Sequence, residues 1–247
     1  MDIVDVHIYQ GQWHWPLRNG TLADTLAVMD RYGMTQGVAM PVNGIAYDFV
    51  EANADLAEEL SHQQRVFGYV MINGNYVDES IEQLHTHLPS EQFVGVKMHP
   101  SYHRIRVDDP GMAPIINVIA EYGAPFMVHT SSTALASVAN ALPVARRHPD
   151  LPIILSHMGR DAWELAIDIA EQADNLYLDP CCSFPDAGKI ERTVGRLGAE
   201  RLLYGSAMME NHPDFTIGMI EDAGLTQGDQ RLIYHGNARR LFGLPQP

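Results

Sequence analysis

The sequence contains few cysteines and no long apolar run, and each shortage excludes a class of protein. Its two cysteines, Cys181 and Cys182, are adjacent. Neighbouring cysteines rarely bridge, so we expect no disulfide framework and a cytoplasmic location. No apolar run approaches the roughly 18 residues of a membrane span, and no signal-peptide pattern precedes the first predicted strand. We therefore expect no association with a membrane.

Basic residues are also scarce. The chain has 16 Lys and Arg against 31 Asp and Glu, which gives a formal net charge of −15. Nucleic acids and anionic membrane surfaces attract proteins of the opposite charge, so we exclude both as partners. A small-molecule substrate fits this composition, and an anionic one remains open because a local basic cluster can oppose the overall charge.

A glycine-rich phosphate loop is missing after the first strand, where Tyr9–Trp13 reads YQGQW. This argues against an open, doubly wound sheet. Eight short apolar segments, the first at 3–8 and the last at 201–205, alternate with helical patterns. Such alternation over about 250 residues is typical of a (β/α)8 TIM barrel. We predict a single α/β barrel domain over residues 1–247, with an extra C-terminal helix at 227–241.

Four of the predicted strands end in a histidine. These are His7, His99, His129 and His157. The carboxyl ends of parallel strands lie on one side of a barrel, where functional groups gather, so we expect the four imidazoles to converge. Neutral imidazole is the commonest metal ligand and also a general acid or base near pH 7.

Several segments resemble, in the same order, those of a known family. They are Asp5–His7, Gly95–Pro100, Val128–His129, Ser156–Gly159, Asn175–Asp179, Arg201–Ser206 and Gly236–Gly243. With them the chain is similar, over nearly its whole length, to the amidohydrolase-related branch of the amidohydrolase superfamily. That group contains aminocarboxymuconate-semialdehyde decarboxylase. The resemblance implies the barrel fold.

The resemblance also implies one divalent metal, usually zinc. Its ligands are a His-x-His pair on the first strand, a histidine on the fifth and an aspartate after the eighth. His7 and His129 match two of these ligands, and His157 matches the family's general acid/base. Tyr9 and Ala207 stand at the other two ligand positions. Two alternatives stay open: one zinc or manganese ion held by a substitute ligand, or a metal-free site like that of a lactonase-like branch of the superfamily.

Lys97 and Tyr9 are further catalytic candidates. Lys97 shares a strand face with His99 and can polarise a substrate; an internal structural cation is the alternative. Tyr9 can serve as an acid or hydrogen-bond donor, or it can simply fill the vacated metal site. Asp5, two residues before His7, is a candidate to orient the His7 ring.

Four residues are candidate substrate contacts. His99 ends a strand, and Arg104 lies in a basic loop where it can pair with a carboxylate. Trp13, followed by His14 and Trp15, can form an aromatic wall of the pocket. We expect Cys181 to line the pocket rather than act as a nucleophile.

These residues support three functional hypotheses. The first is a hydrolase that attacks a C–O or C–N bond in a lactone, lactam or amide, with His157 as general acid/base and with His7 and His129 holding a metal or the substrate carbonyl. The second is non-oxidative decarboxylation of an aromatic or unsaturated acid. The third is a non-catalytic binding protein on a degenerate scaffold. By resemblance we expect a homodimer.

Overall fold

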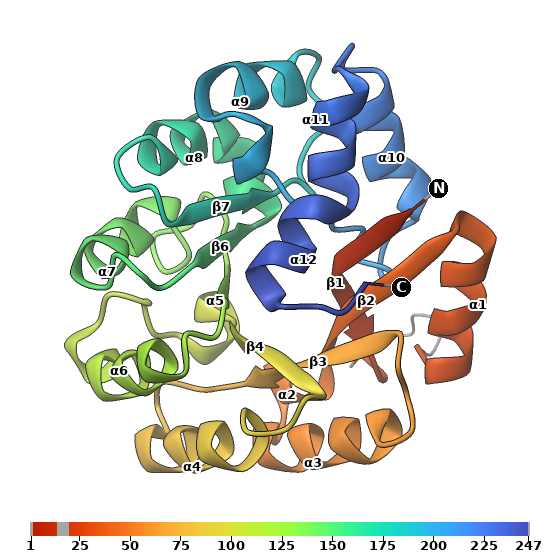
Figure 1. Cartoon of the computed structure of the whole chain (residues 1–247). Helices are drawn as coiled ribbons and strands as arrows, with labels where there is room; N and C mark the ends of the chain where they lie inside the picture. The colour runs from red at the N-terminus through yellow and green to blue at the C-terminus, as the bar shows by residue number, and fades with distance from the viewer. Residues whose placement is uncertain (1, 14–19, 247) are drawn as a thin grey trace.

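The computed structural model describes residues 2–13 and 20–246, and its centre is a sheet of seven parallel strands in the order β1 to β7. The strands curl into a ring with helices outside it (Figure 1). Their bounds are β1 Ile3–Gln10, β2 Met34–Pro41, β3 Val66–Met71, β4 Phe93–Met98, β5 Phe126–His129, β6 Ile153–Ser156 and β7 Leu176–Asp179. The predicted TIM-barrel fold is confirmed.

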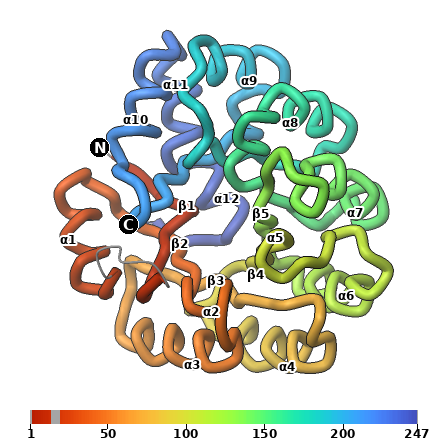
Figure 2. The backbone as a smooth tube through the Cα atoms, turned by 180° about the vertical axis from the view of Figure 1, so that it is seen from behind, coloured from red at the N-terminus to blue at the C-terminus, as the bar shows by residue number. Residues whose placement is uncertain are grey.

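Helices connect successive strands and surround the ring (Figure 2). They are α1 Leu22–Tyr32, α2 Asn43–Ala46, α3 Phe49–Leu60, α4 Val77–His87, α5 Pro100–His103, α6 Ala113–Tyr122, α7 Ala141–Arg147, α8 Trp163–Ala170, α9 Lys189–Leu197, α10 Pro213–Glu221, α11 Gln227–Arg231 and α12 Asn237–Phe242. Local chemistry sets their ends. In α1, for example, the Thr21 side chain accepts from the Asp24 amide and Gly33 closes the helix at φ 66°.

The eighth predicted strand is an irregular segment that nevertheless closes the ring. Between β7 and β1, the Leu203 amide donates to the Leu178 carbonyl at 2.9 Å, and the Val6 amide donates to the Tyr204 carbonyl at 3.0 Å. No regular strand forms because other groups take up backbone amides that a ladder would use, and the Tyr204 amide donates to the Ile233 carbonyl at 3.0 Å. The Ser206 amide, for instance, donates to the Asp5 carboxylate at 3.1 Å.

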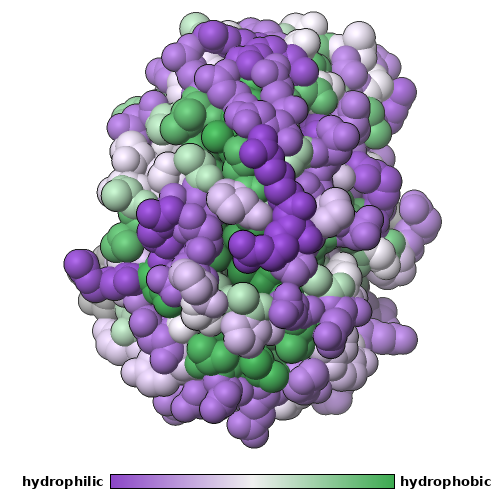
Figure 3. Space-filling view, turned by 90° about the vertical axis from the view of Figure 1, so that its left-hand side faces the viewer, coloured by the Kyte–Doolittle hydropathy of each residue, from purple (hydrophilic) through white to green (hydrophobic). Residues whose placement is uncertain are grey.

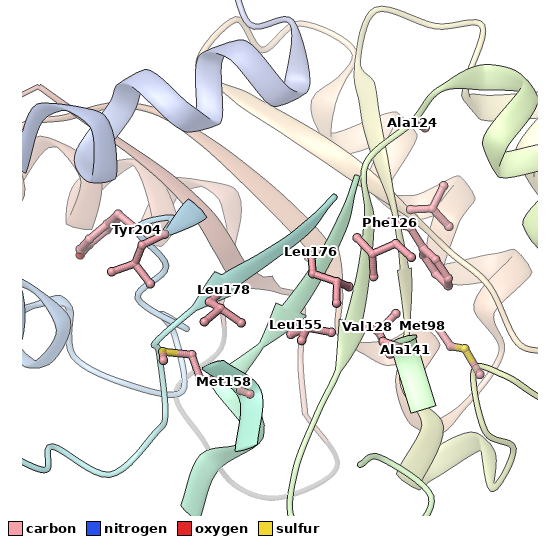
Figure 4. Close-up of a cluster of buried hydrophobic side chains, with 14 of the residues drawn as sticks. Met98, Ala124, Phe126, Val128, Ala141, Leu155, Met158, Leu176, Leu178 and Tyr204 are labelled. Atoms are coloured by element: carbon pink, nitrogen blue, oxygen red, sulfur yellow. The ribbon is translucent and has the colours of Figure 1, made fainter. Parts of the chain in front are cut away.

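Alternating residues of each strand face opposite sides, which gives the barrel two apolar cores. Phe126 and Val128 of β5 and Leu155 of β6 point toward the surrounding helices (Figure 4). Met127 and Ile154 face the other way and belong to the core that fills the barrel. Inward-facing residues at the carboxyl ends of the strands can therefore reach the open end of the barrel.

The C-terminal helices cover the end of the barrel where the strands begin. Helix α12 lies over the middle of the ring (Figure 1), and its Phe242 ring contacts the Tyr69 ring of β3 at 5.8 Å. Arg239 on the same helix pairs with Asp2, which precedes β1, at 2.7 Å. This end is therefore plugged, so the opposite end, where the strands finish, is left for ligand access.

The outer surface gives no sign of a membrane-crossing element. On the face shown in Figure 3, hydrophilic residues predominate and hydrophobic ones form separate patches. Among the described residues, no helix combines the length and the apolar character needed to cross a bilayer.

Candidate active site

The four strand-end histidines converge at the carboxyl ends of the strands, as the sequence predicts. The rings of His99 and His129 stack with centroids 3.7 Å apart, and His129 packs against His157 at 4.7 Å. His157 in turn lies 4.8 Å from His7. The four rings thus form a continuous row from β4 through β5 and β6 to β1.

Burial keeps these rings uncharged at neutral pH. Burial lowers the pKa of His7 and His157, and it lowers the pKa of His99 and His129 to well below the ordinary histidine value. The positive charge of the neighbouring Lys97 acts in the same direction on all four. Neutral rings leave lone pairs free to accept protons or to bind a ligand.

His7 is oriented by a carboxylate from β7. Its Nδ1 lies 2.6 Å from Asp179 Oδ2, and both side chains are fully buried. Burial by itself raises the pKa of Asp179, but His7 outweighs this and lowers it to about 2. An ionised Asp179 requires the proton on His7 Nδ1, so the lone pair lies on Nε2, a buried atom with no hydrogen-bond partner among the described residues. The Asp5 carboxylate, predicted to orient this ring, instead accepts from the His7 backbone amide at 2.9 Å.

His157 stands on an unusual turn. Residues 157–160 all have positive φ, with values of 65°, 48°, 72° and 59°. The turn is held from β5, because Thr130 Oγ1 donates to the Ser156 carbonyl at 2.6 Å and accepts from the Gly159 amide at 2.9 Å. His157 Nδ1 donates to the Cys181 carbonyl at 3.1 Å. Since a carbonyl only accepts, His157 Nε2 is the nitrogen available to a substrate.

A cavity of about 520 Å³ opens over this row of histidines. It is lined by Tyr9, Trp13, His99, Ser101, Tyr102, His129, Ser131, Ser132, Thr133, His157, Arg160, Asp161, Cys182, Phe184 and Glu210. A larger hollow, about 790 Å³, lies near the start of β2 and β3. It contains no histidine among its lining residues, so we place the candidate site in the smaller cavity.

The structure brings five of the predicted site residues to the cavity: Tyr9, Trp13, His99, His129 and His157. Tyr9 links the aromatic wall to the histidines, because its ring lies 5.1 Å from His7 and 5.5 Å from Trp13. Burial raises the pKa of Tyr9 well above 10, so it is a neutral phenol. The neighbours of Trp13 in the predicted aromatic wall, residues 14 and 15, lie outside the described residues.

Three predicted residues, His7, Lys97 and Cys181, lie beneath the cavity rather than in its wall. Lys97 is fully buried, and its Nζ donates to Ser156 Oγ at 3.1 Å. Burial lowers its pKa to about 8. Cys181, expected to line the pocket, is also fully buried, with Sγ 3.2 Å from His7 Nδ1. Its neighbour Cys182 lines the cavity instead, because the chain turns there at φ 52°.

One predicted contact lies away from the cavity, and three charged lining residues, Arg160, Asp161 and Glu210, are not among the predicted site residues. Arg104 is exposed at the end of α5 with φ 55°, outside the lining residues, so the expected pairing with a substrate carboxylate finds no support. None of these three lining residues is assigned a role in the site from the sequence. A usable signal existed for Arg160: it follows His157 by three residues in the loop after β6.

The family's four-ligand metal set does not fit this site. Its first-strand pair is reduced to His7, because the neutral phenol of Tyr9 replaces the second imidazole. Ala207 is fully buried and supplies no donor in place of the aspartate. A different group could hold a metal ion: one donor atom each from His7, His157 and Cys181 lie within 4.8 Å of one another. Imidazole and thiolate are donors that suit zinc.

Taken together, the geometry provides an acid/base imidazole, an oriented second imidazole and an aromatic-walled cavity with a cation and two carboxylates in its lining. Cavities of this size suit a small organic ligand.

Comparisons with known proteins agree with the fold. A family model described as amidohydrolase matches residues 4–244. No curated protein sequence matches the chain. Among solved structures, 2,6-dihydroxybenzoate decarboxylase from Rhizobium is 18% identical, with a TM-score of 0.78 and 98% of each chain covered.

Two further solved structures are similar. Dihydroxybenzoic acid decarboxylase from Polaromonas sp. JS666, with manganese and the inhibitor 2-nitroresorcinol bound, is 17% identical at a TM-score of 0.77, covering 100% of this chain and 98% of that one. A candidate 2-pyrone-4,6-dicarboxylic acid hydrolase from Pseudomonas putida is 16% identical at a TM-score of 0.70, covering 99% and 98%. At these identities the likeness concerns the fold alone.

Proposed function

Because the chain belongs to the amidohydrolase family, we propose that it is an enzyme that removes CO2, without oxidation, from an aromatic or unsaturated carboxylic acid. The observation that carries this proposal is the fixed tautomer of His157. Its Nδ1 is bound to the Cys181 carbonyl at 3.1 Å, and the ring lines an aromatic-walled cavity. A single positioned proton donor beside a planar pocket is what such a reaction requires. The decarboxylase names of two structural neighbours support the same choice.

The proposed step moves one proton and breaks one bond. Protonated His157 donates from Nε2 to the ring carbon that bears the carboxylate. The bond between that carbon and the carboxylate then breaks, its electron pair returns to the ring, and CO2 leaves. The neutral imidazole takes a proton from solvent. The bound carboxylate favours the charged form of His157 next to it, which opposes the effect of burial.

Hydrolysis, the reaction that the sequence favoured, is the second candidate. Some structural neighbours carry a hydrolase name. Hydrolysis needs a group that activates a water molecule, and the position from which the family supplies a carboxylate is the fully buried Ala207. Decarboxylation does not need that group, which is why we rank it first.

The family's metal set does not fit, so no proposed step passes through a metal ion. A zinc ion bound by His7, His157 and Cys181 would occupy the imidazole that we assign as the proton donor. We therefore propose that the reaction proceeds without a metal, and that the ring of His129, which lines the cavity, positions the substrate.

The test is turnover of a panel of hydroxybenzoic acids, unsaturated acids and lactones, with CO2 release and acid release measured separately. We expect CO2 release, reduced about 100-fold or more in His157→Gln, the usual range for removing a general acid. His62→Gln, an exposed histidine remote from the cavity, is the control. Equal CO2 release by His157→Gln would overturn the assignment. Acid release from lactones without CO2 would establish hydrolysis, and ligand binding without any turnover would favour the binding-protein hypothesis.

A further inference from the structure

Arg160 is a basic residue in an unusual position. Of the described residues that line the cavity, it is the single lysine or arginine. Within residues 2–13 and 20–246 it forms no hydrogen bond and no ion pair within 4 Å, although its charge acts on Glu210 across the cavity. In a protein with 31 acidic side chains against 16 basic ones, a guanidinium that lines the candidate active site without a close ion pair calls for an explanation.

The backbone at Arg160 points to a requirement for its side chain. The residue has φ 59° and ψ −107°, a conformation that glycine adopts freely and other residues adopt at a cost of about 1–3 kcal/mol. If only the shape of the turn mattered, glycine would be the better residue there. The same turn carries His157, so both side chains reach one cavity from one rigid loop.

We propose that Arg160 binds a second acidic group of the substrate, one that the product retains. This rests on the proposed function and names its substrate class: an aromatic or unsaturated acid with two acidic groups. One carboxylate lies at His157 and leaves as CO2. The other pairs with the guanidinium, which can present two parallel N–H donors to a carboxylate.

The energetics of the reaction explain why Arg160 should bind the retained acidic group and not the carboxylate that leaves. A carboxylate that becomes neutral CO2 loses its charge in the transition state, so an ion pair to it that outlasts the proton transfer, such as one with an arginine, would stabilise the substrate and slow the step. Binding energy from a remote group that does not react carries no such penalty. A cation three residues from the proton donor, on the rim and not under the ring, suits the retained group.

Two carboxylates share the rim with Arg160, namely Glu210 and Asp161. Burial raises the pKa of Glu210, and the charge of Arg160 acts against this effect. An anionic ligand therefore competes with Glu210 for the guanidinium. The competition predicts moderate affinity that falls with ionic strength, because the rim is open to solvent.

The experiment is equilibrium binding of unreactive probes, measured by calorimetry on the whole chain. Benzene-1,3-dicarboxylate has two carboxylates, benzoate has one, and 3-carbamoylbenzoate replaces the second by a neutral amide of similar shape. We expect the dicarboxylate to bind about tenfold more tightly than 3-carbamoylbenzoate at low salt, as for a hydrogen-bonded ion pair. Arg160→Gln should abolish this difference and Arg160→Lys should keep part of it.

Two other variants make the result specific. Arg147→Gln, at an exposed position on α7, changes the net charge equally and should leave the difference intact. Arg104→Gln tests the residue that the sequence suggested. Loss of the difference in Arg104→Gln but not in Arg160→Gln would overturn the proposal, and so would equal binding of all three probes to the unaltered protein.

This test separates the anchor from the reaction. Arg160-dependent binding with no CO2 release from any dicarboxylic acid would refute the decarboxylase assignment and leave the anion site standing. CO2 release with an unchanged KM in Arg160→Gln would refute the anchor and leave the decarboxylase standing.

Discussion

Replacing Asp179 by asparagine removes a charge and changes few atoms. It therefore tests the hydrogen bond between Asp179 and His7 beneath the cavity directly. In the structure the carboxylate accepts from His7 Nδ1 at 2.6 Å and from the Cys181 amide at 3.0 Å. All of these groups are fully buried. Asparagine has the same shape but no charge, so the bond to His7 loses its ionic character.

The magnitude follows from the pKa of Asp179. His7 lowers this pKa from its ordinary 3.8 to about 2 even though burial acts in the opposite direction. At about 1.36 kcal/mol per pKa unit, the carboxylate gains on the order of 2 kcal/mol on folding. Burial lowers the pKa of His7, so the ring is neutral and the bond joins a neutral donor to a charged acceptor. Such bonds contribute about 1.5–3 kcal/mol. We expect Asp179→Asn to lose about 2 kcal/mol of unfolding free energy at pH 7.

The assay is urea unfolding at several pH values, with Asp161→Asn on the exposed rim as control. A carboxylate whose folded pKa is depressed stabilises the protein above its unfolded pKa of about 3.8 and loses this contribution as pH falls toward 2. The difference between the two proteins should therefore be full at pH 6 and shrink below pH 4. A difference under about 0.5 kcal/mol at pH 7, the size expected for a surface substitution, would refute the paired geometry.

Two predictions concern the reaction itself. Burial lowers the pKa of His157, and the proposed step uses the protonated form of its ring. We therefore expect kcat/KM to rise as pH falls and to level off below a midpoint under 6.5. A profile that instead rises with pH would show that the neutral ring is the active form. Dialysis against a chelator should leave kcat within about twofold, and excess zinc should inhibit by occupying His157 together with His7 and Cys181. Activity lost on chelation and restored by manganese would contradict the metal-free proposal.

The sequence determined the architecture and the histidine row. Buried parallel strands appear as short apolar runs, and the residue that ends each run must lie at the catalytic end of the barrel. His7, His99, His129 and His157 were therefore predictable without coordinates. The replacement of two metal ligands by Tyr9 and Ala207 came instead from the resemblance to the amidohydrolase-related family, which implies a ligand at each of these positions.

What the tertiary structure decided lies in the loops and in contacts across the barrel. Asp179 and His7 are 172 residues apart, and no local pattern shows which of two carboxylates, Asp5 or Asp179, reaches the ring. Cys181 and Cys182 differ in access to the cavity because of one positive φ, which sequence does not reveal for a residue other than glycine.

The direction of a loop also explains why the sequence predicted Arg104 as a substrate contact while the structure places Arg160 at the cavity. Both arginines follow a strand end in sequence, and both adopt positive φ. Only the fold shows that the turn after β6 bends its arginine over the cavity while α5 carries the other into solvent. Strand periodicity is a local property that a sequence records, whereas the direction of a loop depends on packing and hydrogen bonds with distant segments, here the bond from Gly159 to Thr130.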